Sequence, residues 1–210
     1  MRVLRCRTLP LLLSLLLPAC SGPGERRTEI ATGADDGCLF ALNSFLPVAG
    51  GWAAAALEDC RVGTCVSGSG DTLRCRVLYR FDVSGWKHGD VTLHLRCAAT
   101  TGSPGAVEVL CIDTFPALPD TMSIAPSDLA AWWDLAAGGI AVGLVNPVPN
   151  REFTFAIPES LVAAKSADGC LCFMLKLADE TRPAGNWMLP VTFDYAVSHN
   201  VVKPWLSLPD

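Results

Sequence analysis

The clearest structural signal in the chain lies at residues 91–97, which read Val-Thr-Leu-His-Leu-Arg-Cys. Apolar and polar side chains alternate through this stretch without a break. Successive side chains of a β-strand point to opposite faces, so the pattern predicts a strand with one buried face and one polar face. Thr92, His94 and Arg96 are expected on the polar face.

The same period of two residues recurs at five other places. These are Cys75–Phe81, Val107–Cys111, Phe153–Ile157, Leu171–Leu177 and Val191–Val197, with turn-forming residues between them. Half-buried strands with short connections are typical of antiparallel sheets, so we expect an all-β fold, an antiparallel β-sandwich with a jelly-roll-like arrangement. Two short helices are expected within it, one at 127–136 with Ser127 as N-cap and one at 159–164 after Pro158.

Composition narrows the class of protein. The chain has 210 residues, of which 50% are hydrophobic and 18% charged, and its formal net charge is -5. A chain this apolar, with six tryptophans, can bury a core and is not a disordered protein. The acidic balance argues against a nucleic-acid-binding protein.

The N-terminus has the features of an export signal. Basic residues precede an apolar run at Leu9–Leu17 that is too short to anchor a protein in a bilayer, so residues 1–19 are expected to be a cleaved signal peptide. Leu17–Cys20 resembles a bacterial lipobox, which predicts lipidation of Cys20 and a cell-surface or outer-membrane lipoprotein. The alternative is ordinary cleavage after Ser21, which gives a secreted extracellular protein.

Two further segments complete the expected organisation. Residues 20–36 are polar and contain glycine, so we expect a flexible tether, followed by a single domain at 37–210. The membrane is then a partner only through the lipid anchor. Cys38–Asp71 is rich in Ala and Gly with weak periodicity, and its role is left open.

Eight cysteines remain after Cys6 and Cys20 are set aside: Cys38, Cys60, Cys65, Cys75, Cys97, Cys111, Cys170 and Cys172. Cysteines of exported proteins form disulfides, so we expect about four bridges, with a connectivity that the sequence leaves open. The cysteine spacings are not those of a zinc site. Cys170 and Cys172 share one face of a predicted strand, so each is expected to reach a separate partner.

Three stretches between residues 78 and 208 carry a resemblance. Leu78–Ser84 joins a phenylalanine–aspartate strand to a serine turn, Phe155–Val162 leads towards a strand of large apolar residues, and Lys203–Leu208 is a proline-containing strand. In this order they resemble the DNRLRE family of extracellular β-sandwich domains, which is allied to jelly-roll carbohydrate-binding modules. The resemblance covers residues 75–210 and implies a glycan ligand. Thr121–Trp133 and the cysteine density depart from the family pattern.

Tryptophans near predicted turns are the main candidates for ligand binding. Sugar rings stack on flat aromatic side chains, and Trp86, Trp133 and Trp187 lie in or beside predicted loops or the short helix. The alternative for each is a place in the core. We therefore expect a non-catalytic, carbohydrate-binding recognition module. The rival hypotheses are a structural or adhesive cell-surface protein that self-associates, and an exported polysaccharide-active enzyme.

Catalytic patterns are weak in this sequence. Ser198-His199 lacks the glycine-flanked elbow that presents a nucleophilic serine. Two pairs of acids are candidates for glycoside hydrolysis, Asp128 with Asp134 and Asp179 with Glu180, but nothing sets either pair on opposite sides of a substrate. We expect no enzymatic activity and no cofactor, apart from a structural calcium ion for which Asp35 and Asp36 are candidate ligands.

Overall fold

A computed structural model describes residues 25–42, 51–55, 59–66, 70–115, 126–166 and 168–209, so the expected signal peptide and Cys20 lie outside the described residues. In chain order the elements are β1 (Glu25–Glu29), the 3-10 turn η1 (Gly33–Asp35), β2 (Asp36–Leu42), β3 (Gly51–Ala55), β4 (Val62–Val66), β5 (Thr72–Asp82), β6 (Val91–Thr101), β7 (Val107–Ile112), α1 (Pro126–Asp134), β8 (Ile140–Val145), β9 (Glu152–Ile157), α2 (Glu159–Lys165), β10 (Cys170–Leu177), β11 (Asn186–Pro190), α3 (Phe193–His199) and β12 (Trp205–Pro209).

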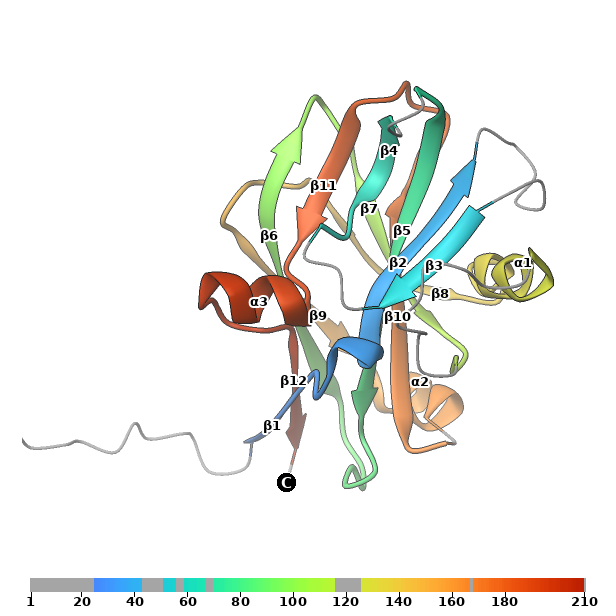
Figure 1. The fold of residues 1–210 in the computed structure, drawn as a ribbon. Helices are drawn as coiled ribbons and strands as arrows, with labels where there is room; N and C mark the ends of the chain where they lie inside the picture. Colours follow the sequence, from blue (N-terminus) through green and yellow to red (C-terminus); the bar gives the residue numbers. More distant parts are fainter. Residues whose placement is uncertain are drawn as a thin grey trace, which may run out of the picture.

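The strands form two layers joined along one side (Figure 1). One layer has the order β1-β12-β6-β9, and the other has the order β11-β4-β5-β10-β7-β8 with β2 and β3 alongside β5. β6 connects the layers, since residues 92–94 pair with β12 whereas residues 97–101 pair with β11. Each pairing is antiparallel, which confirms the expected all-β sandwich.

The main core lies between the two layers. The alternation that predicted β6 is confirmed, because Val91, Leu93 and Leu95 are buried while the residues between them are half-buried. Aromatic rings fill the centre, where Phe81 and Phe173 meet edge to face with ring centroids 6.0 Å apart.

Other sequence-based expectations are confirmed in position. β5, β7, β9 and β10 cover the four predicted strands at 75–81, 107–111, 153–157 and 171–177. α2 follows Pro158 as predicted. α1 begins at Pro126, so that Ser127 lies in its first turn and is not its N-cap.

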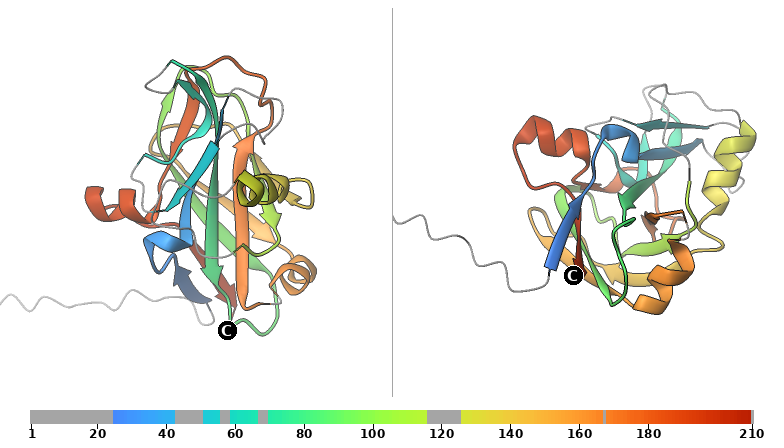
Figure 2. Two further views of the ribbon diagram at one scale, coloured as in Figure 1. Left: turned by 45° about the vertical axis from the view of Figure 1, so that its right-hand side comes forward. Right: turned by 90° about the horizontal axis from the view of Figure 1, so that it is seen from below.

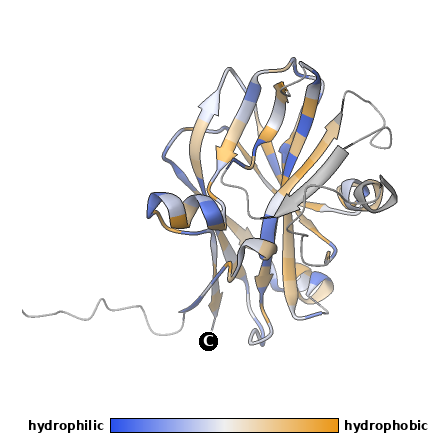
Figure 3. Ribbon diagram, viewed as in Figure 1, coloured by the Kyte–Doolittle hydropathy of each residue, from blue (hydrophilic) through white to orange (hydrophobic). Residues whose placement is uncertain are grey.

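β10 departs from the expected pattern of one buried and one polar face. Leu171 and Phe173 point into the main core, whereas Cys172 and Met174 pack on the opposite face in a second apolar cluster with Trp133 of α1. Figure 2 shows α1 lying outside this layer, and Figure 3 shows that β10 is hydrophobic along most of its length. A polar face is missing here because α1 covers it.

A buried arginine holds α1 against the sheet. Arg76 of β5 is 5% exposed, and its guanidinium lies 3.8 Å from the centroid of the Trp133 ring. Nη1 donates a hydrogen bond to the Trp133 carbonyl at 2.8 Å, while Nε and Nη2 bind both carboxylate oxygens of Glu180 at 2.8 Å. The bidentate ion pair compensates the cost of burying the charge.

The strand predicted at Val191–Val197 is wrong, because the chain forms α3 there. The Thr192 hydroxyl caps the helix by accepting a hydrogen bond from the Tyr195 N–H. Asn200 ends the helix in the left-handed conformation with φ 52°. Residues suited to both helix ends therefore outweigh the alternation of apolar side chains.

The flexible tether predicted at 20–36 is wrong from Glu25 onward. β1 pairs with β12 along its whole length, Ile30 is buried in the core, and Asp36 is buried at the start of β2. The polar composition that suggested a tether belongs instead to an edge strand with an exposed face. The domain therefore begins before residue 37.

Candidate functional site

The edge strands β8 and β9, one from each layer, lie beside each other along one side of the sandwich without pairing. Within the described residues, β8 pairs with β7 alone and β9 pairs with β6 alone. A groove of about 460 Å³ lies between these edges and α2. Its lining residues carry no charge; they are Ile140, Ala141, Val142, Ala156, Pro158, Ser160, Leu161 and Ala164.

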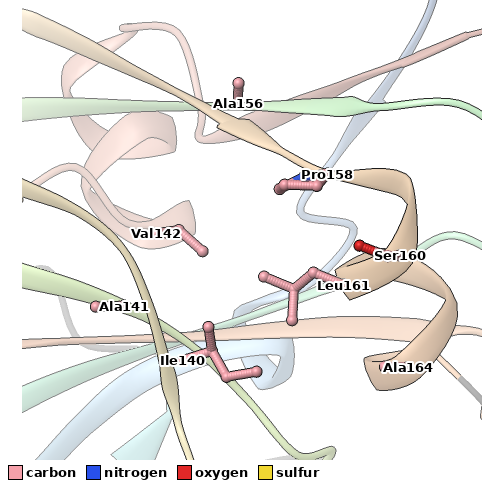
Figure 4. A pocket seen from close by; sticks show the side chains of 8 residues that line it. All are labelled: Ile140, Ala141, Val142, Ala156, Pro158, Ser160, Leu161 and Ala164. Atoms are coloured by element: carbon pink, nitrogen blue, oxygen red, sulfur yellow. The ribbon is translucent and has the colours of Figure 1, made fainter.

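The side chains of three elements point into this groove. Figure 4 shows Ile140, Val142 and Leu161 directed towards one another, with Pro158 beside them and the Ser160 hydroxyl at the rim. That hydroxyl is the one polar side-chain group among the lining residues, and it does not titrate in the physiological range. The groove is therefore suited to binding apolar groups and offers no acid or base for catalysis.

Two local features shape the groove. The register between β7 and β8 shifts at Val109 and Leu110, a β-bulge that leaves Val142 without a residue directly opposite. Gly143 lets β8 approach β9, because a Cβ at this position would overlap the ring of Phe155. Glycine is therefore required here by the close approach of a buried aromatic side chain.

β8 exposes large apolar side chains to solvent. Ile140 is 48% exposed and Leu144 is 63% exposed, and residues 140–148 include no charged residue. Natural edge strands are usually protected by charges, prolines or a covering element against pairing with other chains. On β8 the protection is limited to the bulge and to Pro147 after the strand.

Trp133, one of the three predicted sugar-binding tryptophans, is not available for stacking. The residue is 7% exposed and belongs to the cluster beneath α1. The Arg76 guanidinium lies over its ring. The alternative considered for this tryptophan, a place in the core, is the one the structure adopts.

Trp86 and Trp187 are half-buried and far from each other. Trp86 lies in the β5–β6 turn, where its Nε1 donates to the carbonyl of Gly89 at 3.0 Å, and Trp187 lies near the start of β11, under the guanidinium of Arg61 at 4.5 Å. The β5–β6 turn and the start of β11 are at opposite ends of the sandwich (Figure 1). The structure therefore does not bring the three predicted tryptophans together.

Trp205 of β12 is an aromatic residue that the sequence interpretation did not select. His94 stacks on its ring with centroids 3.6 Å apart, and the guanidinium of Arg27 lies 4.5 Å from its centroid. His94 and Arg27 come from β6 and β1, the strands on either side of β12, so the ring is enclosed between them. Trp205 thus links the three strands of this layer through its ring contacts.

Three of the groups considered for catalysis, His199, Asp179 and Glu180, are engaged in other contacts. The His199 ring stacks on Tyr195 within α3, with centroids 4.0 Å apart. Asp179 accepts hydrogen bonds from Thr181, and Glu180 is bound to Arg76. Asp134 is exposed on α1, whereas the side chain of Asp128 lies outside the described residues.

Asp35 and Asp36, the predicted calcium ligands, both bind protein groups. Asp35 pairs with Arg80 at 3.2 Å, and the Asp36 carboxyl accepts a hydrogen bond from the Phe193 N–H at 2.6 Å. Burial raises the pKa of Asp36 to about 8, against the effect of that hydrogen bond and with help from the charges of Asp194 and Asp35. In the described part of the chain, no group of three His, Cys, Asp or Glu residues is placed to hold a metal, and the calcium site stays a prediction.

The structure describes all eight cysteines and joins none of them, so the expected disulfides stay a prediction. The sulfurs of Cys65 and Cys75 lie 3.0 Å apart, and the Cys38 and Cys60 thiols are neighbours in the core, where each shifts the pKa of the other.

The other four cysteines make different contacts. Cys97 donates to the carbonyl of Ala99, and Cys172 packs with Phe115 in the second cluster. As predicted, Cys170 and Cys172 share one face of β10, on the side of the second cluster, whereas Cys111 faces the main core. Burial raises the pKa of Cys111 and Cys172 to about 12, so both thiols are poor nucleophiles.

Within the described residues, no helix has the length and apolar character needed to cross a membrane. Comparison with protein-family models and with curated proteins finds no match for this chain, so the function has to be inferred from the geometry of the site itself.

Proposed function

We propose that this protein is a non-catalytic surface module that self-associates through the β8 edge, with the adjacent groove receiving apolar side chains of a second copy. The observation that carries the proposal is an uncharged edge strand with exposed Ile140 and Leu144 beside an apolar groove. The export signal expected at residues 1–19 would place this contact outside the cell.

The composition of β8 favours a second copy as the occupant. Two identical uncharged strands can pair antiparallel about a two-fold axis, and each copy then supplies both the open edge and the apolar side chains that the other receives. No like charges meet in such a pair, because residues 140–148 carry none. Removing Ile140 and Leu144 from water contributes about 2 kcal/mol for each side chain that becomes fully buried.

Sedimentation velocity over a wide range of protein concentration tests the proposal. We expect the wild-type protein to form dimers or larger assemblies and the variant Leu144→Lys to remain monomeric, because pairing would bury the new charge. Val197→Lys is the matched control, since Val197 is 60% exposed on α3, away from β8. A wild-type protein that is monomeric at all concentrations, or equal loss of association in both variants, refutes the proposal.

A glycan ligand is the second candidate, and Trp187 is the residue to examine. Its ring is half-buried and carries an arginine over one face, a combination that supplies a stacking surface and hydrogen-bond donors for sugar hydroxyls. Binding to a glycan array that is lost in Trp187→Leu and kept in Val197→Lys would support this function. A folded wild-type protein that binds no glycan would exclude it.

A further inference from the structure

Four cysteines in or around β4 form two pairs, one that includes a residue just before this strand and one that includes a residue near its end. Cys60 comes two residues before β4, whereas Cys65 is within it. Cys38 lies on β2 and Cys75 on β5. We propose that the oxidised protein contains two disulfides, Cys38–Cys60 and Cys65–Cys75, and that the other four described cysteines stay as thiols.

The register between β4 and β5 brings Cys65 and Cys75 together. Cys65 is opposite Leu73 and Cys75 is opposite Gly63, so the two cysteines are diagonal neighbours on adjacent antiparallel strands. Both are buried in the main core, and their sulfurs are 3.0 Å apart. A bond between them therefore needs only a small rotation of the side chains.

The first pair is formed between β2 and the segment that leads into β4. Cys38 is opposite Val77 of β5, and both Cys38 and Cys60 are completely buried. Burial and the neighbouring Cys60 thiol raise the pKa of Cys38, and both residues belong to the main core cluster, so the two thiols are neighbours there. This contact fixes the residue before Arg61 against β2.

The position of the pairs explains why cysteines are concentrated here. β4 is short and pairs with β5 over residues 63–66 and with β11 over residues 62–64. Few ladder hydrogen bonds hold such a strand, and a bridge near each of its ends compensates for that weakness. The cysteines of the region at 38–71, whose role the sequence left open, thus fasten β4 to its neighbours.

Each bridge forms by thiol–disulfide exchange with an external disulfide, such as glutathione disulfide or an enzyme-borne one. The thiolate of Cys65 attacks one sulfur of the oxidant and releases a thiolate. The sulfur of Cys75, after losing its proton, then attacks the Cys65 sulfur and releases the second thiolate. Two electrons pass to the oxidant and two protons are lost. The hydrogen bond from Cys75 lowers the pKa of Cys65, which favours Cys65 as the attacking residue.

Tryptic peptide mapping by mass spectrometry identifies which cysteines are joined. The purified full chain is incubated with glutathione disulfide, unfolded, alkylated at its remaining thiols and digested. Cleavage at arginine places Cys38 and Cys60 together in peptide 28–61, Cys65 in 62–74 and Cys75 in 75–76. We expect an unalkylated peptide 28–61 that is two hydrogen masses lighter, a covalent pair of 62–74 with 75–76, and alkylation of the other four described cysteines.

Single variants separate the two bridges. In Cys65→Ser we expect Cys75 to become alkylated while peptide 28–61 keeps its internal bond. Cys97→Ser is the control and should leave the map unchanged, because the Cys97 thiol binds a backbone carbonyl. A bond between peptides 28–61 and 62–74, or alkylation of all eight cysteines after oxidation, overturns the proposal. The wild-type map decides this even if a variant fails to fold.

Discussion

The buried carboxyl of Asp36 makes the stability of the fold depend on pH, and the variant Asp36→Asn tests that dependence. The residue is 1% exposed, and its carboxyl accepts the Phe193 N–H at the start of α3. The negative charges of Asp194 and Asp35 add to the cost of ionising it. Asparagine has nearly the same shape and retains an oxygen for that hydrogen bond, but it carries no charge at any pH.

The sign of the effect follows from the two pKa values. The pKa of Asp36 is about 8 in the folded protein and 3.8 as its ordinary value, so the folded state holds the proton more tightly. The stability that this carboxyl contributes is complete below about pH 4, is lost as the pH rises, and stays lost above about pH 8. Each pH unit in that interval costs about 1.4 kcal/mol, so the free energy of unfolding should fall by about 4 kcal/mol between pH 5 and pH 8.

Urea unfolding of the two proteins at a series of pH values measures this difference. We expect Asp36→Asn to gain stability over the wild type steadily from pH 5 to pH 8, while other titrating groups cancel in the comparison. Asp179→Asn serves as control: this aspartate is exposed, and hydrogen bonds from Thr181 lower its pKa, so the difference should be flat over the same range. Parallel curves for Asp36→Asn and the wild type would refute the reasoning.

Three other substitutions probe the packing and the bridges. Glu180→Ala leaves a buried guanidinium without its partner and should lower the free energy of unfolding in urea by about 3 kcal/mol. Gly143→Ala forces a methyl group into a buried ring and should cost about 2 kcal/mol in a thermal melt, whereas Gly138→Ala has room for its Cβ and should cost far less. The double variant Cys65→Ser/Cys75→Ser should lose about 3 kcal/mol under oxidising conditions, and this difference should disappear when a reductant opens the bridge in the wild type.

The sequence predicts correctly those strands that have one buried face and one polar face. β6 alternates because its apolar residues face the main core while the polar residues between them lie half-buried on the other face of the strand. β10 is apolar on both faces because α1, which is distant in sequence, lies on its outer side. Local periodicity contains no information about such a covering element, so the expected polar face could not be corrected from the chain alone.

Two errors come from patterns with more than one structural solution. The alternation at Val191–Val197 fits a strand, but Thr192 and Asn200 supply the two ends of a helix, a signal that was present in the sequence. The polar residues of β1 fit a tether as well as an edge strand. Their pairing with β12 depends on the far end of the chain.

The candidate site was only partly accessible to sequence reasoning. The uncharged run at 140–148 is visible in the sequence and marks an exposed edge strand. The groove beside it is not, because β8 and β9 are brought together by their separate pairings with β7 and β6. Trp133 is a candidate ligand-binding residue in the sequence because it lies in the predicted short helix, and nothing in the sequence indicates that Arg76 covers its ring.

The pairing of β1 with β12 has a consequence for when the fold can be completed. The Ser207 hydroxyl and the Glu25 carboxylate meet across a separation of 182 residues. A contact between the two ends of a domain forms slowly and only after the whole chain has become available. Because β1 precedes β12 in the chain, β1 lacks this partner until β12 has emerged, and in the meantime its edge is open to capture by a chaperone or by another chain.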